Sequence, residues 1–253
     1  MTPFATLRHA LLLMLVVCME TINAFIPNQL TTRLSSSTTA IFAEKSLTLY
    51  GSQGSRSPLV NWAAYELGLD ITMGDLSRNP HPFGQIPCLE HYKIDSKDPT
   101  MVFESGAILL YLDALSDKSS NKGEIYSWVS WANASLDPIC FLETPNGKVY
   151  DTGLKDVKNP KIYKLNQLLQ ERSFLVGDEI SVADVAVASY LLYVVQFFPD
   201  VDLSTWPSMV QYMKRCASRE EYGMAFGNRV QEFLLDKLDK MGSDRKEKLF
   251  RML

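Results

Sequence analysis

The sequence is poor in cysteine and histidine, and this scarcity argues against a metal site. The 253 residues include 4 cysteines and 3 histidines. The cysteines form no Cys-x-x-Cys pair, and neither residue type recurs at the spacing of metal ligands. We therefore expect no metal in this protein.

The chain also lacks the signals of nucleotide and nucleic-acid binding. It has no P-loop, no Gly-x-Gly-x-x-Gly fingerprint, no internal repeat and no long basic run. Its formal net charge of −4 at pH 7 argues against a nucleic-acid partner. The remaining composition, 46% hydrophobic and 21% charged, is that of a globular protein with one large domain or two small ones.

Residues 1–43 have the composition of a targeting presequence. An apolar run, ALLLMLVVCM (10–19), has the length of a signal-peptide core and is too short to span a bilayer. Residues 21–43 contain no acid and a stretch rich in serine and threonine, which is typical of transit peptides. This combination resembles the bipartite presequence of algae with secondary plastids. We expect delivery to the plastid through the secretory pathway, with no membrane association of the mature chain. The alternative is a secreted or endomembrane protein.

After the presequence, the chain changes character at a polar linker, SDKSSNKG (116–123). Before the linker, residues 44–115 alternate between predicted strands and helices in the order β-α-β, then β-β-α. Beyond it, residues 124–253 show helical periodicity in successive segments, and no further strand is predicted. The pattern predicts a small α/β domain followed by an all-helical domain.

Four segments in this order resemble the glutathione transferase superfamily, over roughly residues 46–227. They are LTLYGSQGSRSPLVNWAAYELGLD, NPHPFGQIPCL, FESGAILLYL and FLVGDEISVADVAVASYLL. The resemblance implies an α/β plus all-α fold class, in which a thioredoxin-like, glutathione-binding domain precedes an all-helical C-terminal domain. It identifies the fold more specifically than the chemistry, because the same fold also serves as a binding module.

The resemblance also implies a set of glutathione-binding residues. The residue before a cis-proline pairs its backbone with the cysteinyl main chain of glutathione, which indicates Ile86 before Pro87. Gln85 is expected to hydrogen-bond the glycine end. Glu104 suits the γ-glutamyl ammonium, whereas the Ser105 hydroxyl and the free N–H groups at a helix start suit the γ-glutamyl carboxylate.

The loop SQGSRSP (52–58) is expected to hold the catalytic hydroxyl. Lowering a thiol pKa by about two units requires roughly 2.7 kcal/mol. One hydroxyl that donates to the thiolate supplies about 1.5–3 kcal/mol, so a serine suffices. By its position relative to the following helix, Ser55 matches the catalytic residue of serine-type members. Ser52 and Tyr50 are the alternatives, and Ser57 is interpreted as the N-cap beside Pro58.

Three further residues are candidates for the second-substrate cleft between the domains. They are Trp131, Asn133 and Phe141. By contrast, Ser181 and Asp184 in ISVADV form a capping-box pattern, to which we assign folding and no chemistry.

The sequence departs from the family's pattern between LGLD and NPHPFGQIP. Relatives usually have a longer second strand and a helix there, often with a basic side chain for the glycine carboxylate. Only ITMGDLSR remains in this chain, and Arg78 or His81 could take that role. The shortening weighs against glutathione affinity.

The resemblance implies a homodimeric glutathione transferase, which uses glutathione as a substrate and adds its thiolate to small electrophiles or reduces organic peroxides. The rival is a non-catalytic module for protein contacts, as in a translation elongation factor subunit. Retention of Gln85, Ile86, Glu104 and Ser105 favours the enzyme, because a scaffold does not need them. The shortened segment favours the module, and the sequence does not identify the electrophile.

Overall fold

The computed structural model describes residues 46–93, 96–116 and 121–250, with side chains described as far as residue 242. The predicted presequence and the middle of the predicted linker lie outside the described residues. Within the described residues, no helix is long and apolar enough to cross a membrane.

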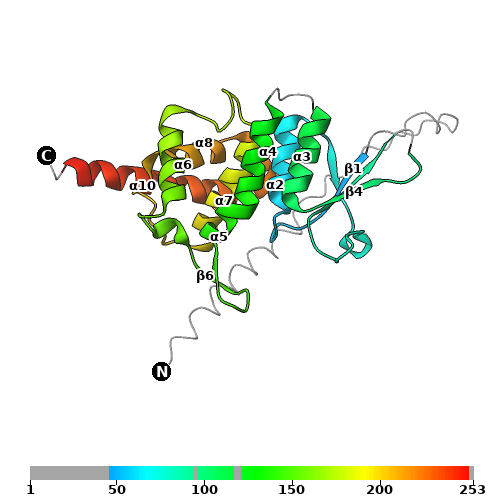
Figure 1. The fold of residues 1–253 in the computed structure, drawn as a ribbon, viewed down its shortest axis with the longest axis horizontal. Helices are drawn as coiled ribbons and strands as arrows, with labels where there is room; N and C mark the ends of the chain where they lie inside the picture. Colours follow the sequence, from blue (N-terminus) through cyan, green and yellow to red (C-terminus); the bar gives the residue numbers. More distant parts are fainter. Residues whose placement is uncertain (1–45, 94–95, 117–120, 251–253) are drawn as a thin grey trace. The chain divides into compact units, whose positions relative to one another are not determined.

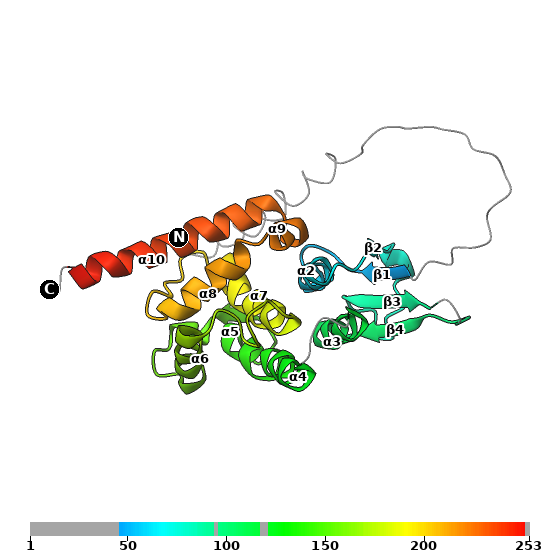
Figure 2. The same cartoon turned by 90° about the horizontal axis from the view of Figure 1, so that it is seen from above.

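A four-stranded mixed sheet forms the first part of the fold, in the order β2-β1-β3-β4. Strand β1 runs parallel to β2, whereas β1 with β3 and β3 with β4 are antiparallel. Leu47 and Leu49 of β1 are buried against the helices α2 and α3, which lie on the same side of the sheet (Figure 2). The elements of this part are β1 (Ser46–Tyr50), α2 (Ser57–Leu67), β2 (Ile71–Met73), η2 (Leu76–Arg78), β3 (Cys88–Tyr92), β4 (Thr100–Phe103) and α3 (Ser105–Ser116).

The second part is built around helix α7, which is buried along nearly its whole length (Figure 1). An apolar sequence on every face requires that other helices surround it. The elements are α4 (Lys122–Trp131), the π-helix η3 (Ala132–Leu136), α5 (Asp137–Cys140), η4 (Gly153–Lys155), α6 (Pro160–Glu171), α7 (Val182–Phe197), α8 (Pro207–Ala217), α9 (Glu220–Phe226) and α10 (Asn228–Phe250).

The structure corrects the prediction that strands end at the linker. A two-stranded hairpin, β5 (Leu142–Glu143) with β6 (Val149–Asp151), follows α5. The turn contains Pro145, Asn146 and Gly147, and Gly147 adopts a left-handed φ of 71°. An Asn-Gly pair after a proline ends a helix and favours a hairpin, and the sequence interpretation overlooked this signal.

The capping box predicted at the start of α7 is confirmed. The backbone N–H of Ser181 donates to Asp184 Oδ2 at 3.0 Å. The other carboxylate oxygen, Oδ1, accepts from the Leu175 N–H at 2.9 Å and from the Tyr212 hydroxyl at 3.0 Å. Asp184 is fully buried, and it therefore joins the loop before α7 to α8.

This buried carboxylate predicts a dependence of stability on pH. Burial outweighs the hydrogen bonds and raises the pKa of Asp184 from 3.8 to about 6. The folded protein then binds a proton where the unfolded chain does not. The contribution is fully present below pH 3.8 and is lost as the pH rises through about 6. The difference in unfolding free energy between wild type and Asp184→Asn should widen by roughly 2 kcal/mol from pH 7 to pH 4. Urea unfolding at both pH values tests this; a constant or narrowing difference would contradict it.

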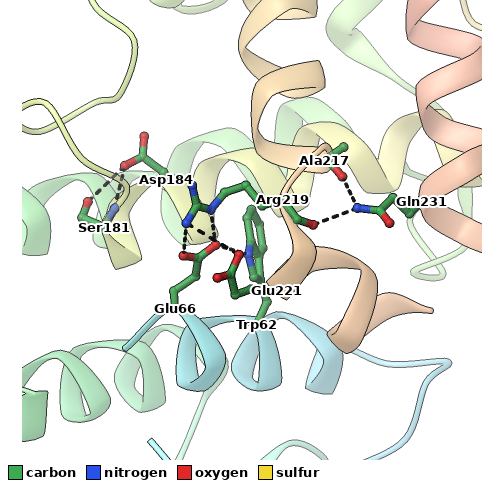
Figure 3. A network of polar contacts seen from close by, with 8 residues as sticks. All are labelled: Trp62, Glu66, Ser181, Asp184, Ala217, Arg219, Glu221 and Gln231. Atoms are coloured by element: carbon green, nitrogen blue, oxygen red, sulfur yellow. Dashed lines mark hydrogen bonds and ion pairs between the residues drawn. The ribbon is translucent and has the colours of Figure 1, made fainter. Parts of the chain in front are cut away.

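An ion pair joins the two parts of the fold (Figure 3). Arg219, at the start of α9, contacts both carboxylate oxygens of Glu66 on α2, with Nη2 2.7 Å from Oε2. The indole Nε1 of Trp62 donates to Glu66 Oε1 at 2.8 Å. Gln231 of α10 donates to the carbonyls of Ala217 and Arg219, both at 2.8 Å. The turn between α8 and α9 therefore connects α10 to the sheet-covering helix α2.

Candidate active site

A cleft of about 420 Å³ lies where the loop before β3 meets the start of α3. All five residues predicted to bind glutathione line it, which are Gln85, Ile86, Pro87, Glu104 and Ser105. The remaining lining residues are Arg56, His81 and Gly84. Pro87 and Glu104, the nearest members of the two segments, are seventeen residues apart in the sequence, so the fold brings the segments together.

The peptide bond between Ile86 and Pro87 is cis. The ladder between β1 and β3 begins at Cys88, so the backbone of Ile86 is outside the sheet pairing. Asn79 Nδ2 donates to the carbonyl of Gln85 at 2.8 Å, which fixes the backbone directly before Ile86. The backbone edge of Ile86 therefore lines the cleft without a strand partner.

Glu104 has an unusual backbone conformation at the opposite wall. Its φ is 68°, in the left-handed region, which costs a non-glycine residue about 1–2 kcal/mol. Its carbonyl accepts from the N–H of Ile108, and the buried Ser105 is the first residue of α3. A strained acid directly before a helix start suits a site that binds an ammonium and a carboxylate side by side.

The loop 52–58, which carries the candidate catalytic hydroxyl, is held by a network of serine hydroxyls. Ser55 Oγ donates to the Ser52 carbonyl at 2.8 Å and lies 2.7 Å from Ser57 Oγ. Ser57 Oγ accepts from the Ser52 N–H at 3.1 Å. A Cβ on Gly51 would lie 2.1 Å from Ser57 Oγ, so glycine is required for this close packing. Ser55 adjoins Arg56, which lines the cleft.

Contrary to the prediction, Ser57 is not the N-cap of α2; Arg56 occupies that position, and Ser55 supplies a hydrogen bond to the first helical N–H. The N–H of Ser57 donates to Ser55 Oγ at 3.1 Å, whereas the Ser57 side chain faces back to Ser52 and is buried. Ser57 is the first helical residue and precedes Pro58, so its own side chain lies one position too late to act as the cap.

The hydroxyl of Tyr50, an alternative catalytic residue, is already hydrogen-bonded to Glu90. It donates to Glu90 Oε2 at 2.6 Å, and this hydrogen bond, together with burial, raises the pKa of Tyr50 to about 12. The Cys88 thiol beside Pro87 is also buried, which raises its pKa to about 11. A thiol that stays protonated is a poor nucleophile.

The three candidates for the second-substrate cleft lie in different surroundings. Trp131 lines a separate apolar groove of about 500 Å³ with Trp128, between α4 and α6. Asn133 Oδ1 accepts from the Tyr190 hydroxyl at 2.8 Å. Phe141 packs edge-on against Phe197 of α7, with ring centroids 5.7 Å apart.

Phe141 belongs to a row of aromatic side chains that reaches the loop 52–58. The ring of Phe197 contacts Tyr193, which in turn contacts Phe226. The Tyr193 hydroxyl donates to the Ser55 carbonyl at 3.2 Å. Phe197 at the outer end is 62% exposed. An apolar surface is therefore tied to the loop that carries the candidate hydroxyl.

Two basic residues line the cleft, and the sequence interpretation assigned only one of them a possible role. His81 Nδ1 accepts from the N–H of Phe83 at 3.0 Å, which leaves a proton on Nε2. Arg56 was not predicted, although its position directly after Ser55 was a signal. Arg78, the other candidate for the lost basic residue, lies in η2 and is not among the described residues that line the cleft. The described residues contain no cluster of three side chains able to hold a metal.

Comparisons with known proteins agree with this architecture. A family model described as "Glutathione S-transferase, C-terminal domain" matches residues 140–220. The disulfide-bond oxidoreductase YfcG of Escherichia coli (strain K12) is 27% identical over 157 residues, which is 57% of this chain and 72% of that protein. Elongation factor 1-gamma of Danio rerio is 26% identical over 169 residues, which is 62% of this chain and 38% of that protein.

A solved structure of a glutathione transferase family member from Pseudomonas fluorescens, with two glutathione bound, has the same fold. It matches with a TM-score of 0.60 at 19% identity, over 72% of this chain and 93% of that chain. The chain has the glutathione transferase fold, and its residues 140–220 match the family model of the C-terminal domain.

Proposed function

We propose that this protein is a serine-type glutathione transferase, which binds glutathione in the cleft and adds its thiolate to a small electrophile or reduces an organic peroxide. One observation carries the proposal: the five residues predicted from sequence to bind glutathione line a single cleft. The solved relative from Pseudomonas fluorescens, which contains glutathione, supports the choice of ligand.

In the proposed reaction, the thiol of glutathione lies near Ser55 and loses its proton to solvent. Ser55 Oγ–H then donates to the thiolate in place of the Ser52 carbonyl, while the Ser57 hydroxyl can donate to Ser55. The sulfur attacks the electrophilic carbon, a C–S bond forms, and the leaving group departs with its electron pair. Glu104 and Ser105 hold the γ-glutamyl end, and Ile86 holds the cysteinyl backbone.

The second candidate is a non-catalytic protein-contact module, which the similarity to elongation factor 1-gamma favours. The strained Glu104 and the unpaired backbone edge of Ile86 favour the enzyme, because a scaffold needs neither. Retention on a glutathione column, followed by a scan of model electrophiles and peroxides, separates the two. An enzyme should be retained on the column and should turn over at least one substrate. A protein that is not retained and turns over no substrate would support the non-catalytic module.

The aromatic row beside the loop predicts how the second substrate binds. Phe197→Ala should lower kcat/KM for an aryl electrophile by roughly three- to tenfold, because one aromatic contact is worth about 0.5–1.5 kcal/mol. Tyr163→Ala is the matched control, since Tyr163 is 53% exposed on α6, outside the row. An equal loss in both variants, or no loss in Phe197→Ala, would remove the row from the site.

We also propose a homodimer that uses the groove between α4 and α6. Trp128, Trp131 and Leu165 give this groove an apolar lining. Trp128→Glu would bury a charge in such an interface and should convert the dimer to a monomer at about 10 μM. Tyr163→Glu, on α6 but outside the described lining of the groove, should stay dimeric. Light scattering measures both; a monomeric wild type would end the dimer proposal.

Plastid targeting by residues 1–43 remains a proposal that rests on composition. A fluorescent protein fused to this segment should enter the plastid. Secretion of the fusion would favour the secretory alternative.

A further inference from the structure

Arg56 joins the cleft to the helical part of the fold. It lines the cleft, and its Nη2 donates to Asp137 Oδ2 on α5 at 2.6 Å. The guanidinium carbon lies 5.1 Å from the centroid of the Tyr190 ring on α7. Two partners from the helical part therefore fix the direction of a side chain that begins beside the catalytic loop.

Tyr190 is in turn connected to the start of α3 through Asn133. The Tyr190 hydroxyl donates to Asn133 Oδ1, and Asn133 lies against Gly106 so closely that a Cβ there would be 2.6 Å from Nδ2. Asn133 belongs to the π-helix η3, an irregularity that often marks functional positions. Gly106 follows Ser105, so the contacts hold Arg56 at the Ser105 end of the cleft.

We propose that Arg56 recognises the α-carboxylate at the γ-glutamyl end of glutathione, with Asp137, Tyr190 and Asn133 as positioning residues. This inference rests on the proposed function. A guanidinium has five N–H donors, and the bond to Asp137 uses one of them. The remaining fork matches a carboxylate in two-point geometry.

The distribution of charge in the cleft favours this end over the glycine end. Among the described residues that line the cleft, Arg56 is the only arginine or lysine. Glu104, at the same wall, suits the neighbouring ammonium. The segment expected to supply a cation for the glycine end is short, and Gln85 and His81 remain there. The cleft therefore offers a permanent positive charge to one carboxylate of glutathione.

Calorimetric titration with three ligands tests the assignment. They are glutathione, the analogue in which hydrogen replaces the γ-glutamyl α-carboxylate, and the ethyl ester of the glycine carboxylate. Arg56→Met should weaken glutathione and the ester by about ten- to a hundredfold, and leave the decarboxylated analogue within about twofold. Arg56→Lys, which keeps the charge but loses the fork, should fall between. Asp137→Asn should weaken glutathione less than Arg56→Met.

Arg172→Met is the control, because Arg172 is similarly exposed and ion-paired, to Glu124, but does not belong to the described cleft lining. It should bind all three ligands as wild type does. Equal weakening of glutathione and the decarboxylated analogue by Arg56→Met would overturn the proposal. So would an Arg56→Met variant that weakens glutathione but binds the glycine ethyl ester as tightly as wild type does, because Arg56 would then contact the glycine carboxylate. A wild type that binds none of the three ligands would instead remove the proposed function itself.

Discussion

Replacing Arg219 with methionine should lower the free energy of unfolding by about 3 kcal/mol, because a buried carboxylate loses its cation. The Glu66 side chain is 5% exposed and the Arg219 side chain 31% exposed, so water can replace only part of the lost interaction. Trp62 still donates to Glu66, but one neutral donor does not offset a buried charge. Chemical denaturation at neutral pH measures the loss.

A double variant separates the buried charge from lost packing. Arg219→Met combined with Glu66→Gln removes both charges, and should recover at least half of the stability lost in Arg219→Met alone. Lys240→Met, which removes an ion pair on the exposed face of α10, should change stability by less than about 0.5 kcal/mol. If Arg219→Met proves as mild as Lys240→Met, the two parts of the fold are not held together by this ion pair.

Ser55→Ala should lower the conjugation rate at neutral pH by about ten- to a hundredfold, from roughly 1.4–2.7 kcal/mol of lost thiolate stabilisation. Glutathione should still bind, since the cleft contacts remain, while the pKa of its thiol rises. Raising the pH should recover part of the rate because hydroxide then generates the thiolate. Ultraviolet titration of the bound thiol and a pH–rate profile measure the two effects.

The structure adds a second consequence of the same substitution. Ser55 Oγ accepts from the N–H of Ser57 at the start of α2, so its loss should also destabilise the protein by about 1 kcal/mol. Ser52→Ala serves as the comparison, because Ser52 contributes backbone atoms to these contacts and keeps them as alanine. Full activity with an unchanged pH profile in Ser55→Ala would exclude Ser55, and a loss of activity in Ser52→Ala would then assign the role to Ser52.

The sequence predicted much of the fold because its signals are local. Gly68 ends α2 in the left-handed conformation, and Ser181 and Asp184 form the expected capping box. The strands and α-helices of the first part follow one another in the predicted β-α-β, then β-β-α order. The hairpin at 142–151 was missed because a short Asn-Gly turn was read within a helical context. The hairpin also has a local signal in the sequence, but the helical periodicity of the flanking segments outweighed it.

The site was predictable where a motif carries its own geometry. Ile86, Pro87, Glu104 and Ser105 lie in short segments whose roles depend on backbone, and they meet in one cleft. The direction of the Arg56 side chain could not be predicted, because it is set by Asp137 and Tyr190, which lie 81 and 134 residues further along the chain. Trp131 lines the groove between α4 and α6, and helical periodicity alone does not tell which neighbour covers a face of a helix.

Titration of the purified chain with glutathione tests the central claim most directly. We expect saturable binding at one site per chain, with a dissociation constant of about 1 mM or tighter. A dissociation constant of about 1 mM corresponds to a binding free energy of roughly −4 kcal/mol. No detectable binding up to about 10 mM glutathione, at a pH where the protein is folded, would contradict this expectation.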